Sequence, residues 1–316
     1  MDLLRFLIRR LASAFVGVMV LSLAVFAMVR LIPGSIEDAY FGTEGASEQV
    51  REAFRARYGL DQPLPLQYLT YLRNLFAGDL GYSIRVQRPV TAALLEKLAP
   101  SLQLAITAVI IAVIFSLVAG TLAALREGRV TDRIVTVNSL VGISVPDFLI
   151  GILLIALVPR YFSSIPSFGY QPLSAGFFEW ARHMVMPAFA LSFVLVGYLS
   201  RLVRSSVLET LKAEHVRTAR GKGLAPKSEL LHHVVRPSLI PVVTTTGVLF
   251  IGALGGVVVI EQVFAIPGLG RLVLEGVRWR DYALVQGATL MIGTIAILVN
   301  LLVDISYRFI DPRVKS

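Results

Sequence analysis

Long apolar runs without a charge recur along this chain and limit what it can fold into. The clearest run extends from Leu102 to Leu125 and contains 24 residues, none of them charged. About 20 apolar residues are enough for an α-helix to cross the hydrocarbon core of a bilayer. Hydrophobic residues make up 55% of the whole chain and charged residues only 16%, with a mean hydropathy of +0.72. Soluble globular proteins rarely have this composition, so we expect an all-α integral membrane protein.

Six segments of this kind are expected to span the membrane. They are Leu11–Val29, Leu102–Leu125, Ile134–Val158, Met184–Leu199, 242–260 and Leu284–Val303. The first segment has 19 uncharged residues, more than the roughly 7–15 of a signal-peptide core, so we interpret it as an uncleaved span. The third segment is interrupted by Asn138 and by the pair Pro146-Asp147.

The parts of the chain outside these spans differ in length and composition. Residues 1–30 are expected to form a tail and the first span. Residues 31–100 are mixed in charge and rich in Pro and Gly, which indicates a small subdomain outside the membrane with a helix near 46–58. Residues 101–316 would form the membrane core, and within it residues 201–241 form a long polar loop.

The net charge of +9 is distributed unevenly between the two sides of the membrane. Six spans place both termini on one side, together with the 126–133 hairpin and the 201–241 loop. These segments carry 17 basic and 8 acidic residues, whereas the opposite side carries 13 basic and 12 acidic residues. The positive-inside rule assigns the basic side to the cytoplasm. Such a division by side argues against nucleic acid as the partner of this basic chain.

Several chemistries are excluded by residues that the sequence lacks. There is no cysteine, so disulfides, thiolate catalysis and cysteine metal sites are excluded. The four histidines do not form an H-E-x-x-H motif, so a zinc protease is unsupported and no metal site is expected. Gly221-Lys222 is followed by Gly223 rather than Ser or Thr, and so it is not a P-loop. We expect no enzyme activity and no cofactor bound directly.

The 201–241 loop is the most distinctive polar stretch. It holds eight basic residues, three acidic residues and three of the four histidines. We expect one helix over Glu209–Leu224 and a second one from Pro226 through Val235. On the first helix Val216, Ala219 and Gly223 would share a small-residue face, flanked by Arg217 and Arg220. This pattern favours a docking element. A helix lying on lipid headgroups, or a helix that ends at Gly223 with positive φ, are the alternatives.

Several stretches in this order resemble one family. Arg217-Thr-Ala-Arg-Gly-Lys-Gly223, followed by Val235-Arg-Pro237, is similar to the signature loop of ABC-importer permeases, whose pattern is E-A-A-x-x-x-G and then I-x-L-P. Arg217 and Thr218 depart from that pattern. The pattern has about nine residues between its glycine and I-x-L-P, and Pro237 lies one residue later than this spacing would place the proline. Further matching stretches are Tyr58-Gly-Leu-Asp-Gln-Pro63, Gly78-Asp-Leu-Gly-Tyr-Ser83, Gln262-Val-Phe-Ala-Ile-Pro-Gly-Leu-Gly-Arg271 and Arg280-Asp-Tyr282. Together they resemble the B-type transmembrane subunit of the dipeptide/oligopeptide type, which also includes nickel and glutathione permeases.

The resemblance implies a fold, a function and partners. It implies a type I ABC-importer permease in the bacterial cytoplasmic membrane, with both termini cytoplasmic. Such a subunit pairs with a second homologous permease, two cytoplasmic ATPases that bind ATP and Mg, and an extracytoplasmic solute-binding protein that would meet residues 30–100 and 261–281. The cargo would be di- or oligopeptides, with nickel, glutathione, opines or sugars as alternatives. The residues implied in coupling to the ATPase are Glu214, Val216, Arg217, Thr218, Ala219, Arg220, Gly223 and Leu224.

Asp147 is the one acidic residue within a predicted span. It lies about 14 residues into the third span, which places it near the middle of the bilayer by helix rise. A charge there costs roughly 2.5–3.5 kcal/mol on insertion scales. Asp147, with Asn138, would then line a translocation pathway and attract a cationic group of the cargo. A structural pairing with Asn138 or with a partner subunit is the alternative. The rival classes of protein are a secondary transporter, a channel and an intramembrane enzyme.

Overall fold

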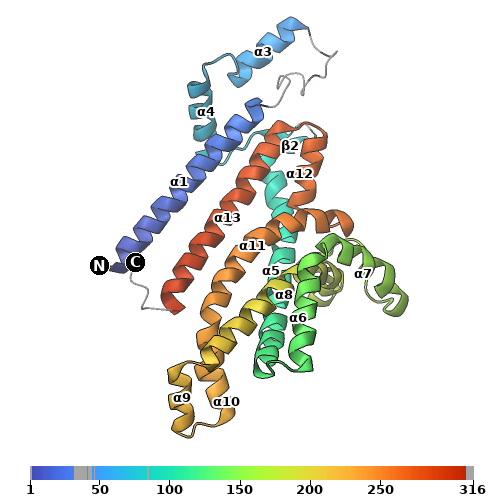
Figure 1. Cartoon of the computed structure of the whole chain (residues 1–316). Coiled ribbons are helices and arrows are strands. Elements are labelled where there is room, and N and C mark those ends of the chain that lie inside the picture. The colour runs from blue at the N-terminus through green and yellow to red at the C-terminus, as the bar shows by residue number, and fades with distance from the viewer. Residues whose placement is uncertain (1, 32–40, 42–44, 46, 84, 311–316) are drawn as a thin grey trace. The chain divides into compact units, whose positions relative to one another are not determined.

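The computed structural model describes residues 2–31, 41, 45, 47–83 and 85–310, and most of them are helical (Figure 1). The polar tail with Arg313 and Lys315, and most residues between 32 and 46, lie outside this described part. The long helices are α1 (Asp2–Leu31), α5 (Val90–Leu125), α6 (Val130–Ser144), α7 (Asp147–Tyr161), α8 (Phe177–Leu211), α11 (Arg236–Val263) and α13 (Tyr282–Ile310). The shorter elements are α3 (Glu48–Tyr58), α4 (Leu64–Phe76), α9 (Glu214–Gly221), α10 (Pro226–Ser228), α12 (Leu269–Arg278), the 3-10 turn η1 (Leu173–Ala175) and the π-helix η2 (Glu229–Val235). Strands β1 (Tyr82–Ser83) and β2 (Arg88–Pro89) form one antiparallel hairpin, with Tyr82 opposite Pro89.

Five segments of the described chain are long and apolar enough to cross a membrane, and a sixth is counted if α6 and α7 form one broken span. The five are Leu4–Leu31, Val90–Leu125, Phe177–Leu211, Pro226–Val263 and Tyr282–Ser306. Each contains one of the predicted spans and extends beyond it, because the polar residues that flank each apolar run also adopt helical structure. Many apolar side chains on these helices stay exposed, among them Ile110, Ile114 and Val118 of α5. Such a surface suits contact with lipid or with another membrane subunit.

The interruption of the third predicted span at Pro146-Asp147 is confirmed, whereas α6 continues through Asn138 without a break. Helices α6 and α7 are bent by 103° at a break between Ser144 and Asp147. Val145 has extended backbone angles of φ −95° and ψ 122°, as expected before a proline, whose ring excludes the helical conformation at the preceding residue. Pro146 also lacks the N–H that would continue the hydrogen-bond ladder. Asp147 is consequently the first residue of α7 and does not lie inside a straight helix.

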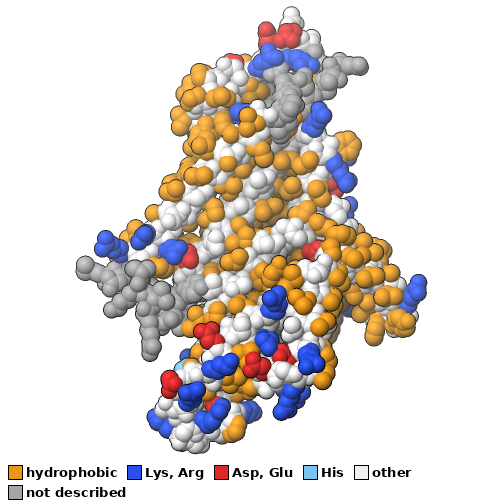
Figure 2. Space-filling model, viewed as in Figure 1, with side chains coloured by type: hydrophobic (Ala, Val, Ile, Leu, Met, Phe, Trp, Pro, Cys, Tyr) orange, Lys and Arg blue, Asp and Glu red, His pale blue; other side chains and the backbone are white. Residues whose placement is uncertain are grey.

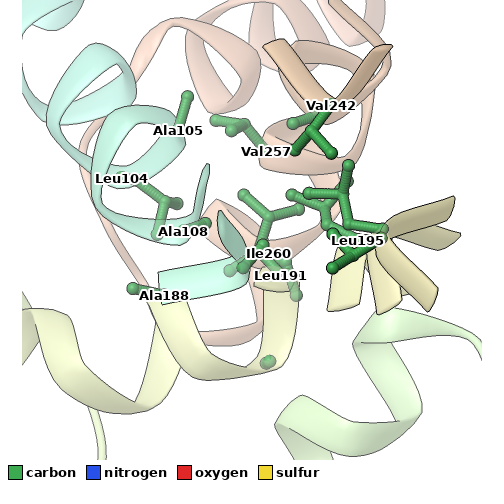
Figure 3. Close-up of a cluster of buried hydrophobic side chains, with 14 of the residues drawn as sticks. Leu104, Ala105, Ala108, Ala188, Leu191, Leu195, Val242, Val257 and Ile260 are labelled. Atoms are coloured by element: carbon green, nitrogen blue, oxygen red, sulfur yellow. The ribbon is translucent and has the colours of Figure 1, made fainter. Parts of the chain in front are cut away.

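One compact unit comprises Pro100–Pro267 and Val299–Ser316. Its core includes Leu104 of α5, Leu191 and Leu195 of α8, and Val257 and Ile260 of α11, whose side chains converge in Figure 3. Small residues bring the backbones close, as is usual where membrane helices pack. A Cβ atom on Gly197 of α8 would lie only 2.8 Å from the carbonyl oxygen of Ser139 in α6. A Cβ atom on Gly120 of α5 would lie 2.8 Å from the Ser200 carbonyl oxygen of α8.

The other compact unit comprises Met1–Ala99 and Gly268–Leu298. Here α1 packs on α4 through Phe26 and Tyr68, whose ring centroids are 5.1 Å apart, and through a 2.9 Å hydrogen bond between Ser22 and the Tyr68 hydroxyl. A second cluster joins the start of α5 to α12 and α13 through Val90, Leu94, Leu272, Leu284 and Ala288.

The extramembrane helices of this unit were only partly predicted. The helix expected near 46–58 is confirmed as α3, whereas α4 and α12 were not predicted. Helix α12 lies within residues 261–281, which follow the fifth predicted span. It buries Leu269 and Leu272 on one face and leaves Arg278 exposed at its end, a pattern too short to distinguish from a loop by periodicity alone.

Candidate functional site

The polar loop between α8 and α11 folds into a short helical hairpin. Helix α8 ends at Leu211, and the N–H groups of Lys212 and Ala213 donate to the carbonyl oxygens of Glu209 and Thr210. Ala213 has extended backbone angles of φ −71° and ψ 145°, so α9 begins in a new direction at Glu214. The single helix predicted over Glu209–Leu224 is therefore wrong, since these residues belong to two helices.

Helix α9 packs its small residues against this chain's own π-helix, η2. The side chains of Val216 and Ala219 are only 1% and 5% exposed, and Val234 of η2 is fully buried. At one edge of this contact Arg220 forms a 2.7 Å ion pair with Glu229 of η2. The small-residue face that was expected to be open for docking is thus largely covered within the chain, and only Gly223 of that face remains exposed.

A second polar contact between α9 and η2 depends on a proline. In an α-helix the carbonyl of His233 would receive the N–H of Pro237, which proline lacks. The Nε2 atom of His215 in α9 lies 3.1 Å from that carbonyl oxygen, and it donates in the tautomer that carries the Nε2 proton. Residues 229–235 form a π-helix, which takes up one residue more than an α-helical turn. This agrees with the position of Pro237 one residue later than the spacing of the permease pattern.

The helix expected over Pro226–Val235 does begin at Pro226. It does not end at Val235, because η2 continues directly into α11 and on to Val263. Pro237 does not interrupt it, because the His233 carbonyl that would have received the missing N–H lies next to His215 instead. Helix α9 is thus held between the end of α8 and the beginning of a membrane-spanning helix.

The opposite face of α9 is exposed. It carries Glu214, Arg217 and Thr218, and the Glu214–Arg217 ion pair of 3.3 Å joins two side chains that are 87% and 70% exposed. An exposed pair of this kind is worth only about 0–1 kcal/mol, so both groups can exchange partners at little cost. Figure 2 shows basic and acidic side chains gathered around α9 and α10. The basic ones include Arg217, Arg220, Lys222 and Lys227.

Gly223 lies two residues after the end of α9 and has a left-handed backbone conformation. Its φ is +76°, and no neighbouring heavy atom lies within 4 Å of the position that a Cβ would take. Its N–H donates to the carbonyl oxygen of Arg220 at 3.0 Å, and the N–H of the half-buried Leu224 donates to Ala219 at 3.4 Å. These bonds form a Schellman-type C-cap, which was the alternative interpretation of this glycine.

Asp147 lies half-buried at the break between α6 and α7. Its Oδ1 accepts a 2.8 Å hydrogen bond from the N–H of Phe148, and a carboxylate at a helix N-terminus is favoured by the helix dipole. Its Oδ2 lies over Gly256 of α11, where a Cβ would approach it to 2.8 Å. Asn138 is exposed on α6, and within the described residues no hydrogen bond joins it to Asp147.

Two buried polar pairs of the same unit were missed by sequence reasoning. Arg204 of α8 holds Asp132 of α6 with contacts of 2.5 and 2.8 Å, and Gly128 N–H donates to the same carboxylate. Glu261, which lies one residue beyond the fifth predicted span, is fully buried near the end of α11 and accepts a hydrogen bond from Ser101. The only sequence signal for these buried pairs was that charged residues lie next to predicted spans. Among the described residues, no three of His, Asp and Glu gather as a metal site would require.

The chain matches two models of protein families. Residues 116–316 match the model described as "Binding-protein-dependent transport system inner membrane component". Residues 3–105 match the model for the N-terminal part of the membrane component of binding-protein-dependent transport systems.

Curated relatives match the chain over nearly its full length. A probable peptide ABC transporter permease of Sinorhizobium fredii is 34% identical over 98% of this chain and 99% of the relative. A putative peptide transport system permease of Brucella abortus is 37% identical over 98% of both. The glutathione transport system permease of Escherichia coli O6:H1 is 36% identical over 99% of both.

The fold also has a counterpart among solved structures. The crystal structure of an amino acid ABC transporter with histidines matches 69% of this chain and 94% of its own, with a TM-score of 0.53 and 16% sequence identity. This similarity concerns the helical arrangement.

Proposed function

Because this chain belongs to the family of binding-protein-dependent transport system inner membrane components, and so is a permease subunit of an ABC importer, we propose that its cargo consists of short peptides. Full-length relatives that are 34–37% identical carry the name of peptide permeases. A relative that is 36% identical is named for glutathione, which is itself a tripeptide. Nickel, opines and sugars are the alternative cargoes.

The energy for import would come from partner subunits. This chain has no P-loop motif, so two cytoplasmic ATPases would bind ATP and Mg, and a second homologous permease would complete the pathway. Alternating access then requires a structural link that carries ATPase movement to the membrane helices. The ATPases would act on this chain from the cytoplasmic side, where the charge distribution also places both termini.

The position of α9 is the observation that carries this proposal. Helix α9 follows α8 after two residues and is bonded by Arg220 and His215 to η2, which continues into α11. A force applied to α9 would therefore reach two membrane-spanning helices. The exposed Glu214, Arg217 and Thr218 would contact the ATPase, while Val216, Ala219 and Leu224 hold α9 in place and Gly223 sets its end. This helix would act as the coupling helix.

Reconstitution tests the proposal directly. The permease pair, its ATPases and the binding protein from the neighbouring gene would be placed in proteoliposomes, and uptake of a radiolabelled tripeptide would be measured with and without ATP. Peptide uptake should require ATP, the binding protein and an intact ATPase. Uptake of nickel or a sugar without any peptide uptake would reject the peptide assignment, and uptake driven by an ion gradient without ATP would reject the coupling model.

A further inference from the structure

A small cavity of about 370 Å³ opens on the unit that contains α12 and α13, and it is lined by Arg85, Glu275, Arg278 and Trp279. Its most distinctive contact is between Arg85 and Trp279, where the guanidinium carbon lies 4.1 Å from the centre of the indole ring. We call this group the Arg–Trp cradle. It combines arginine with tryptophan, two of the residue types that most often dominate the binding energy of protein interfaces.

The Arg–Trp cradle is held in place by a buried carboxylate. Asp281 is only 2% exposed, and its Oδ2 accepts hydrogen bonds from the Ser83 hydroxyl at 2.6 Å and from the Arg85 N–H at 3.2 Å. Its Oδ1 accepts a third bond, from the N–H of Leu284 at 3.1 Å. One side chain thus ties the β1–β2 hairpin to the start of α13 and fixes Arg85 next to Trp279.

The turn after α12 presents the indole ring outward. Arg280 has a positive φ of 53°, and the Asp281 N–H donates to the Gly276 carbonyl oxygen at 2.9 Å, which closes the turn around Trp279. As a result Trp279 is 57% exposed and its neighbour Val277 is 56% exposed. Leaving an indole in contact with water has a hydrophobic cost, and an interface that covers it would recover this cost.

The charge of the Arg–Trp cradle selects the kind of group that fits it. Arg85 and Arg278 are both exposed, and Glu275, the acidic lining residue, already pairs with Arg271 at 3.3 Å. A guanidinium presents a planar fork of N–H donors that matches a carboxylate in two parallel hydrogen bonds. The complementary group is therefore an acidic side chain, and the exposed indole indicates an apolar contact beside it.

We propose that the Arg–Trp cradle is the docking point for an acidic segment of the solute-binding protein. This proposal rests on the function proposed above and on the expectation that residues 261–281, which contain α12 and its neighbouring turn, meet the extracytoplasmic binding protein. A carboxylate of the binding protein would bridge Arg85 and Arg278, and an adjacent apolar side chain would cover Trp279. Rim charges of this type mainly govern association rate and its salt dependence.

The test uses the complete complex in nanodiscs and measures ATP hydrolysis as loaded binding protein is added. In Arg278→Glu the concentration of binding protein that gives half-maximal stimulation should rise about tenfold or more, since like charges facing each other across an interface cost several times RT. Basal hydrolysis should stay at the wild-type rate. Arg278→Gln and Trp279→Ala should have smaller effects in the same direction. The matched control is Arg160→Glu, which reverses an exposed arginine at the end of α7, outside both segments expected to meet the binding protein, and should leave the titration unchanged.

The outcomes separate this inference from the proposed function. If wild-type hydrolysis does not respond to the binding protein at all, the proposed function fails. If it responds and Arg278→Glu matches wild type, the proposal for the Arg–Trp cradle alone is overturned. An effect of Arg278→Glu that occurs in anionic lipid but vanishes in neutral lipid would show that a lipid headgroup occupies the cradle, which also overturns the proposal. A photoreactive maleimide on Val277→Cys should crosslink to an acidic stretch of the binding protein.

Discussion

Single residues determine the backbone conformation where short helices end in the loop between α8 and α11, and Gly223, just after α9, is the clearest example. A residue with a Cβ in the left-handed conformation costs about 1–2 kcal/mol, less for asparagine, which can hydrogen-bond locally. Because the space around Gly223 is open, Gly223→Ala should destabilise the loop more than Gly223→Asn. The melting temperature of the purified complex should therefore be lower for Gly223→Ala than for Gly223→Asn. If asparagine proves the more harmful residue, a partner surface rather than the backbone conformation requires glycine.

Asp147 is the second residue whose role is local and testable. Its carboxylate lies at the α6–α7 break and over Gly256, where it would face a passing cationic group. Asp147→Asn keeps the size and the hydrogen bond from Phe148 but removes the charge. Uptake of free-amine peptides should fall several-fold, whereas uptake of N-acetylated peptides should change little. Asn138→Ala, which alters an exposed residue six positions before the end of α6, is the comparison variant. Equal losses for both kinds of cargo would favour a structural role.

At the scale of helices, the Asp132–Arg204 pair links α6 to α8. Asp132 is buried and Arg204 is partly exposed, so removing one partner should cost about 1–3 kcal/mol, below the range for a fully buried pair. Asp132→Asn and Arg204→Met should each lower the melting temperature of the complex. The double variant should recover part of the loss, because no unpaired charge remains. Additive losses in the double variant would show that the two side chains are not coupled.

Helix α9 makes a second prediction at this scale. Arg217→Glu reverses a charge on its exposed face, where the arginine contacts only Glu214 among the described side chains. Affinity of the detergent-solubilised permease pair for its ATPases should fall at least about tenfold, as for like charges brought together at an interface. Arg129→Glu, in the α5–α6 turn, is the matched control, because Arg129 is predicted to lie on the same side of the membrane as α9. Undiminished binding of the ATPases to Arg217→Glu would remove α9 from the contact.

The sequence predicted where the long helices lie better than it predicted where they end and which of their faces are buried. The apolar runs are long enough to reveal α1, α5, α8, α11 and α13, because the bilayer demands a minimum length. The break after α8 was missed, since Lys212 and Ala213 are both good helix formers and tertiary contacts override that preference. The buried face of Val216 and Ala219 depends on η2, a neighbour that local periodicity does not reveal. Asp132 and Arg204 lie 72 positions apart, so no local pattern connects them.

At the scale of the whole molecule, the charge distribution predicts how the chain is inserted in the membrane. The chain lacks cysteine, so single cysteines placed at Asp79, Arg129, Lys222 or Arg278 report their own surroundings. In intact cells an impermeant maleimide should label positions 79 and 278 and should reach positions 129 and 222 only after permeabilisation. Labelling of Lys222→Cys without permeabilisation would contradict the orientation and, with it, the cytoplasmic position of α9.

Helix α8 gives the coupling step a mechanical scale. Pro187 lies within this 35-residue helix, where it removes one backbone hydrogen bond and permits local bending. The 25 residues from Pro187 to Leu211 are separated by 24 steps of about 1.5 Å and so form an arm of about 36 Å. A hinge rotation of about 10° at the proline would swing the end of this arm by about 6 Å, close to the pitch of one helical turn. A displacement of about 6 Å at the end of α8 next to α9 would therefore correspond to a bend of only about 10° at Pro187, with the segment Pro187–Leu211 acting as a lever arm.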